Sequence, residues 1–222
     1  MDNLEKQMII ERYNKRLSEF GYNPKTLGWG EKMRHNLRYN ILLTHWDLNG
    51  KSVLDFGCGF GDMYGYANKI NLKIKYHGID INENLIAEGK KIYPDANLYI
   101  KDIFDEKNEK SEKKYDYILS SGVHNSKIRD NWGFIKKTFE FFDKYSIKGF
   151  ALNFLSDKVD YQLEYTYHAN PMEILDLAYT YSNRITLRND YMPFEFTIFI
   201  DKENEFDKEQ VVYPDYKKYV IE

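Results

Sequence analysis

Short apolar runs alternate with stretches of helical spacing along most of this 222-residue chain. From Ile9 to Phe20 the apolar side chains recur every three or four positions, which predicts a helix over residues 2–20. A loop is expected over residues 21–30, because this stretch contains a proline and three glycines. The same helical spacing then predicts a second helix over residues 33–44, so two helices are expected before the first strand.

The middle of the chain repeats a strand–helix unit. Apolar runs that predict strands lie at residues 53–54, 74–79, 97–100, 115–119 and 150–153. Helical patterns lie between them at residues 63–70, 82–92 and 128–142. Alternation of this kind predicts an α/β protein with an open, mostly parallel sheet and helices on both faces.

The last third of the chain departs from this regular alternation. Asn170 can cap a helix whose first position is Pro171, where the missing N–H costs nothing. Residues 154–169 therefore stand outside the alternation as an insertion. Two further apolar runs, residues 184–187 and 194–200, are expected to close the sheet as an antiparallel pair.

The pattern predicts one domain over residues 1–222. Residues 1–48 form a helical cap, and residues 49–200 form the core, in which the insertion acts as a lid. The charged run at residues 104–114 is expected to be solvated loop and frayed helix, and residues 201–222 a charged tail.

Composition narrows the class of protein further. A net charge of −3 gives no basic footprint for nucleic acid, so a small-molecule substrate is expected. The single cysteine, Cys58, cannot form an internal disulfide, which favours a reducing cytoplasm. No apolar run approaches the roughly 18 residues of a membrane span, and the charged N-terminus is unlike a signal peptide. No His, Asp and Glu cluster has metal-site spacing, so no metal is expected.

The stretch from Val53 to Asp62, VLDFGCGFGD, places an acid and three glycines where a strand turns into a helix. Glycines permit positive φ and let a ligand lie against bare backbone. A dinucleotide loop needs G-x-G-x-x-G, but Asp62 stands where the last glycine would fall. Asp55 would repel a pyrophosphate, whereas it suits the ammonium and sulfonium of S-adenosylmethionine (SAM). These residues therefore favour SAM over a dinucleotide.

This D-x-G-x-G-x-G stretch resembles motif I of the class I SAM-dependent methyltransferases, and the resemblance extends over roughly residues 30–200. In that family an acid after the second strand binds the ribose, a role that Asp80 would take here. A polar residue after the third strand lies by the adenine, which points to Asp102, and motif IV would begin at Ser120. The resemblance implies a Rossmann-like, seven-stranded sheet with an antiparallel last strand, SAM as cofactor and S-adenosylhomocysteine (SAH) as product.

In the family, helices before the first strand cover the cofactor. Arg38 is therefore expected to pair with the SAM carboxylate, with a solvated helix charge as the alternative. Trp29 is expected to pack or act as a lid, and Cys58 to fill space in the loop. The cofactor-binding residues that the resemblance implies are Trp29, Arg38, Asp55, Gly57, Cys58, Gly59, Asp80, Ile81, Asp102, Ile103, Ser120 and Ser121.

Transfer of the methyl group to a hydroxyl calls for a general base. His124 follows the fourth strand, where family members present substrate-facing residues, and a reference pKa of about 6.5 would leave it mostly neutral. His168 in the insertion is the second candidate. The alternatives are a structural histidine for His124 and a surface histidine for His168. An amine acceptor would need no such base.

The acceptor side of the site is expected in and around the insertion. Tyrosines there could stack on a flat acceptor, or act only as lid packing. Acids beside the last strand could hydrogen-bond hydroxyl groups, or act as edge charges. The candidate substrate-binding residues are Asn125, Tyr161, Tyr165, Tyr167, Asp190 and Glu195.

Motifs in the second half narrow the acceptor class. The absence of D/N-P-P-Y at motif IV argues against adenine-N6 and glutamine amide methyltransferases. D-Y-x-x-F-E-F-T from Asp190 and G-F-A-L-N-F-L from Gly149 resemble methyltransferases of bacterial surface-polysaccharide gene clusters. That resemblance implies a role in polysaccharide biosynthesis, with a sugar, nucleotide-sugar or capsule precursor as acceptor.

Four functions remain open from the sequence. An O-methyltransferase with a sugar-like acceptor is the first hypothesis, and an N-methyltransferase on a small molecule is the second. A SAM-binding partner subunit without its own activity is the third, and a dehydrogenase is the weakest.

Overall fold

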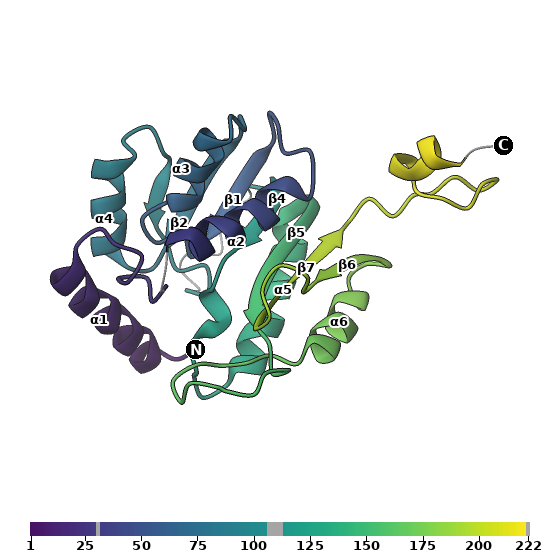
Figure 1. Ribbon diagram of the computed structural model, residues 1–222. Helices are drawn as coiled ribbons and strands as arrows, with labels where there is room; N and C mark the ends of the chain where they lie inside the picture. The colour runs from purple at the N-terminus through teal and green to yellow at the C-terminus, as the bar shows by residue number, and fades with distance from the viewer. Residues whose placement is uncertain (30–31, 106–112, 221–222) are drawn as a thin grey trace.

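The computed structural model describes residues 1–29, 32–105 and 113–220 (Figure 1). Its α-helices are α1 (Asn3–Phe20), α2 (Lys32–Thr44), α3 (Asp62–Lys69), α4 (Glu83–Ile92), α5 (Asn131–Tyr145) and α6 (Pro171–Tyr179). Its strands are β1 (Ser52–Phe56), β2 (Lys75–Asp80), β3 (Leu98–Ile100), β4 (Tyr115–Ser120), β5 (Ser146–Leu155), β6 (Arg184–Arg188) and β7 (Glu195–Asp201). Short 3-10 helices are η2 (Val123–Asn125) and η3 (Pro214–Tyr219). Predictions that concern residues 30–31, 106–112 and 221–222 lie outside the described residues.

Over the described residues the strands form one seven-stranded sheet in the order β3-β2-β1-β4-β5-β7-β6. Strands β1 to β5 run parallel to one another, and β7 is antiparallel to both β5 and β6. The predicted mostly parallel sheet with an antiparallel last strand is therefore confirmed. Strand β5 is longer than the predicted residues 150–153, because its pairing with β7 continues to Leu155 opposite Glu195.

The core lies in two layers because side chains alternate along each strand. Val53 and Leu119 face one layer, which contains buried side chains from α2 and α3. Leu54 and Ile118 face the other layer, which contains buried side chains from α5 and α6. Strands buried on both faces read as continuous apolar runs, which is why their positions could be predicted.

Helix α1 lies beside α4 rather than on the sheet (Figure 1). Its start is fixed by Asp2, which accepts a hydrogen bond from the Glu5 amide at 2.9 Å. Glu5 returns the interaction by accepting from the Asp2 amide at 3.1 Å, so both groups of a capping box are present. No side chain of α1 is fully buried, so its apolar side chains do not pack into a filled core.

Regular structure resumes after the insertion at Pro171, as predicted. After β5, Ser156 forms an isolated bridge with Ala169, and the chain between them is irregular. Asn170 then caps α6 by accepting from the amide of Met172 at 2.9 Å.

The chain after β7 extends away from the sheet and carries η3 (Figure 1). Across the described residues no helix combines the length and the apolar character that a bilayer crossing needs.

Candidate functional site

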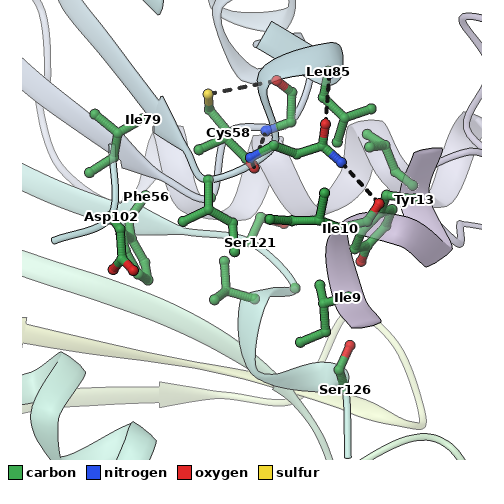
Figure 2. A pocket seen from close by; sticks show the side chains of 18 of the residues that line it. Ile9, Ile10, Tyr13, Phe56, Cys58, Ile79, Leu85, Asp102, Ser121 and Ser126 are labelled. Carbon is green, nitrogen blue, oxygen red and sulfur yellow. Dashed lines mark hydrogen bonds between the residues drawn. The ribbon is translucent and has the colours of Figure 1, made fainter. Parts of the chain in front are cut away.

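A cavity of about 130 Å³, here called the glycine-loop cavity, lies at the carboxyl ends of β1, β2 and β4. Strand β1 has β2 on one side and β4 on the other, so the order of the strands reverses at this point. Ligands of open α/β sheets bind at such a switch point. Figure 2 shows Ile9 and Tyr13 of α1 on the side of the cavity opposite Ile79.

The loop after β1 depends on two glycines. Gly57 and Gly59 have φ of +73° and +56°, where a residue with a Cβ atom is strained. A Cβ on Gly57 would also lie only 2.1 Å from Cγ2 of Val123. The amides of Gly57 and Cys58 both donate to the carbonyl of Ile79, at 2.9 and 3.0 Å. The loop is thereby fastened to the end of β2 and presents bare backbone to the cavity.

Asp80 ends β2 on the wall of this cavity. Its carboxylate accepts the Gly59 amide at 2.9 Å and the Asn82 amide at 2.8 Å. Burial raises the pKa of Asp80, and these backbone hydrogen bonds oppose the rise. The two amides hold the carboxylate in one orientation, so it can accept hydroxyl groups from a ligand.

Most of the predicted cofactor residues line the glycine-loop cavity. They are Trp29, Gly57, Cys58, Gly59, Asp80, Ile81, Asp102, Ile103 and Ser121. Ser120 lies just behind this wall, where its hydroxyl donates to the Phe56 carbonyl at 3.1 Å.

Asp55 is a correction to the sequence-based prediction, since its carboxylate is not on the cavity wall. Its neighbour Phe56 lines the cavity, and successive side chains of a strand point to opposite faces. Asp55 is only 2% exposed and accepts the Tyr76 hydroxyl at 2.6 Å. Burial raises the pKa of Asp55 to about 7. Its carboxylate thus faces Tyr76 of β2 rather than the cavity.

Helix α1 closes the cavity and is held there by polar contacts. Lys6 forms an ion pair with Asp102 at 2.5 Å. Asn82, which caps α4, donates to the side chain of Asn14 at 3.0 Å. The resemblance implied that helices before the first strand cover the cofactor, but the sequence did not single out Ile9 and Tyr13 as lining residues, although their spacing placed them on one apolar stripe.

A second cavity, of about 520 Å³, adjoins the first. The two have five lining residues in common, which are Tyr13, Leu27, Trp29, Gly122 and Ser126. The predicted residues Asn125, Tyr161, Tyr165 and His168 line this second cavity. Tyr161 and Tyr165 are 74% and 55% exposed, so both rings are accessible.

Arg38 and Glu195 form a buried ion pair, which corrects two predictions. Nη2 of Arg38 lies 2.5 Å from Oε2 of Glu195, and Nε donates to the same oxygen at 2.6 Å. The side chains are 5% and 1% exposed. Arg38 is therefore occupied by this chain rather than by a cofactor carboxylate. Glu195 is likewise not presented to a substrate.

The ion pair also positions the wall between the cavities. The Arg38 guanidinium lies 4.0 Å from the centre of the Trp29 ring, a cation–π contact. Asn153 donates to Glu195 at 3.3 Å, and its own side-chain oxygen accepts the Gly122 amide at 2.7 Å. Trp29 and Gly122 both line the two cavities, so one buried network supports their common wall.

His124 is the fourth predicted residue to be corrected, because it is buried and lines neither cavity. It is 2% exposed, and its ring packs against Phe134 and Phe154 with centroids 4.8 and 5.4 Å away. Burial lowers the pKa of His124 to about 3. His124 does follow the end of β4, as predicted, but its side chain points into the core instead of into a cavity.

His168 lines the second cavity, and two hydrogen-bonding groups hold its ring. Its Nδ1 lies 2.7 Å from the Ser156 carbonyl, which can only accept, so the neutral ring carries its proton on Nδ1. Nε2 then presents a lone pair, 3.1 Å from the Thr166 hydroxyl. That hydroxyl has one proton, which it can donate either to Nε2 or to the Leu163 carbonyl at 2.8 Å. The ring is therefore held in one tautomer by the inserted segment.

Two other predicted substrate residues lie away from both cavities. Asp190 is exposed and forms an ion pair with Arg188 at 3.0 Å. This agrees with the alternative that Asp190 is an edge charge rather than a substrate-binding residue. Tyr167 is half-buried and packs against the core layer that contains α5 and α6. Neither residue is part of the candidate site.

Residues 47–148 match a methyltransferase domain family. The chain is also 28% identical over 159 residues to Rv1506c of Mycobacterium tuberculosis, a provisionally named methyltransferase; the match covers 68% of this chain and 93% of that protein. A methyltransferase 235L of Invertebrate iridescent virus 6, also provisionally named, is 33% identical over 72 residues, which cover 32% of this chain and 26% of that one.

Solved structures share the fold at low sequence identity. Magnesium protoporphyrin IX methyltransferase from Synechocystis PCC 6803 with bound SAH has a TM-score of 0.59 at 13% identity, with 87% of this chain and 94% of that chain covered. The DhpI–SAM–HEP complex has a TM-score of 0.63 at 14% identity, with 90% and 98% covered. The Rossmann-like fold implied by the resemblance is therefore confirmed.

The buried ion pair gives a stability prediction. Glu195→Ala leaves the Arg38 charge buried and unpaired, so the free energy of unfolding is expected to fall by about 3–5 kcal/mol. Urea unfolding measures the change. Asp190→Ala, which breaks an exposed pair, is the control and should leave stability almost unchanged. Equal losses of unfolding free energy in Glu195→Ala and Asp190→Ala would contradict the assignment of Arg38 and Glu195 as a buried ion pair.

Asp55 gives a pH-dependence prediction. Its pKa is about 7 in the folded protein and 3.8 in the reference state, so between these values the folded state binds the extra proton. Stability from this group therefore falls as pH rises from about 4 to 7 and then levels off. In thermal unfolding, Asp55→Asn should gain stability relative to wild type as pH rises from about 4 to 7, and the difference should then stay constant. A difference that does not change with pH would contradict this.

Proposed function

We propose that this chain is a SAM-dependent methyltransferase that transfers a methyl group to a hydroxyl of a small-molecule acceptor. SAM is the cofactor and SAH the product. The glycine-loop cavity is the cofactor site and the second cavity is the acceptor site. No oligomeric state is part of the proposal.

The cofactor site is supported by its position and its chemistry. A glycine loop at the switch point presents backbone to the ligand, and an oriented carboxylate, Asp80, lies beside it. Asp102 lies on the same wall, although Lys6 of α1 now occupies one of its oxygens. The match to a methyltransferase domain family spans these residues.

The wall common to the two cavities is the observation that carries the proposal. Methyl transfer needs the sulfonium and the acceptor atom in line and in contact, which can supply about 7–11 kcal/mol of the barrier reduction. Trp29, Gly122 and Ser126 line both cavities, so ligands in the two would meet there. No covalent step by the protein is needed, because the neutral thioether leaves as the new C–O bond forms.

His168 is the proposed general base. Its Nδ1–H is held by the Ser156 carbonyl, so Nε2 can take the acceptor's proton. It lines the acceptor cavity, unlike His124. A positioned base of this kind contributes about 10²–10⁴-fold to the rate.

The acceptor class is proposed as a sugar, nucleotide-sugar or related surface-polysaccharide precursor. Tyr161 and Tyr165 line the acceptor cavity with accessible rings, which suits the flat apolar face of a sugar ring. A cytoplasmic location would fit such precursors.

Calorimetric titration with SAH and NADH tests the cofactor site. Wild type should bind SAH and not NADH, and Asp80→Asn should bind SAH about tenfold or more weakly, because it loses a carboxylate acceptor. Asp95→Asn, an exposed change outside the cavity, is the matched control. Failure of the wild-type protein to bind SAH would overturn the proposed function.

His168→Ala tests the base, with radiolabelled SAM and a panel of neutral, acidic and amino sugars as acceptors. The rate of hydroxyl methylation should fall by about 10²–10⁴-fold while SAH affinity is retained. His77→Ala, in β2 but outside both cavities, is the control. An unchanged rate with transfer to an amine would instead favour the N-methyltransferase.

A further inference from the structure

The arginines of this chain divide into two groups. Four have a carboxylate partner within 4 Å, which are Arg38, Arg129, Arg184 and Arg188. The other three, Arg12, Arg16 and Arg34, have none among the described residues, and all three line the second cavity. The unpaired guanidinium groups are therefore gathered in one place.

The second cavity carries a net positive wall. Among the described residues that line it there is no aspartate or glutamate. Its fourth arginine, Arg38, is already neutralised by Glu195. Within residues 1–29, 32–105 and 113–220 the other three have no carboxylate partner, so their positive charge can serve a ligand.

Arg12 is the most constrained of the three. Its Nη2 donates to the Ser126 hydroxyl at 2.7 Å, while its Nε is buried and has no hydrogen-bond partner. A buried donor without an acceptor costs free energy, which an anionic ligand atom would recover. Arg16 follows one turn later on α1, so both side chains lie on one face of the helix.

We propose that the second cavity binds an anionic acceptor, whose phosphate or carboxylate group is held by Arg12, Arg16 and Arg34. Guanidinium groups match both anions through paired N–H donors. The accessible rings of Tyr161 and Tyr165 then cover the uncharged part of the molecule. The inference rests on the proposed function only in identifying the bound molecule as the methyl acceptor.

The test uses the full chain saturated with SAH, titrated with three probes by calorimetry. The probes are uridine diphosphate, glucuronate and neutral glucose, so a phosphate and a carboxylate source are compared with an uncharged sugar. One anion should bind more tightly than glucose. Arg16→Gln and Arg34→Gln should each weaken that anion about tenfold or more. Neither side chain donates a hydrogen bond within the described part of the chain, so folding should be retained.

Arg129→Gln is the matched control, because it removes the same charge from an exposed ion pair outside the cavity. Its anion affinity should equal that of wild type. Anion affinity that is the same in all variants, or no preference over glucose, would overturn the inference while SAH binding leaves the methyltransferase proposal standing. Loss of SAH affinity in Arg16→Gln and Arg34→Gln would overturn it too, because these arginines would then serve the cofactor carboxylate. Absence of SAH binding in wild type would instead remove the proposed function itself.

Discussion

The buried pair of Arg38 and Glu195 is the interaction on which the candidate site depends. It joins α2 to the start of β7, two segments 157 residues apart. Removing two charges from water is costly, and only good geometry with further hydrogen bonds offsets that cost. Here the same two residues hold Trp29 by a cation–π contact and reach Gly122 through Asn153. The wall between the two cavities is thus fixed by an electrostatic network rather than by apolar packing alone.

The fold could be predicted because the central strands β1, β4, β5 and β7 are largely buried and because two of the helices begin at a recognisable cap. Asn82 and Asn170 cap α4 and α6 as the sequence indicated. The acids of the glycine-loop cavity could be predicted as well, because the carboxyl ends of parallel strands meet at one edge of the sheet. Asp80 lies there because it is the last residue of β2, and Asp102 lies there because it comes two residues after the end of β3.

The direction of a side chain was what the sequence could not supply. Asp55 lies one residue before a cavity residue, and the alternation of a strand turns it to the other face. His124 is in the right loop, but its ring fills a space between Phe134 and Phe154. Arg38 pairs with Glu195 of a strand far along the chain, and no local sequence pattern indicates such a partner. These errors all concern tertiary contacts, whereas the errors in element positions were small.

Helix α1 connects the two halves of the site. Lys6, Ile9 and Tyr13 recur at helical spacing on the face toward the glycine-loop cavity, while Arg12 and Arg16 reach the second cavity from the adjacent face. Because no side chain of α1 is buried in a filled core, the helix is held mainly by polar contacts at Asn82, Asp102 and Ser126. All three of these contact residues line the glycine-loop cavity, and Ser126 lines both cavities. A ligand in either cavity would therefore lie against a residue that also contacts α1.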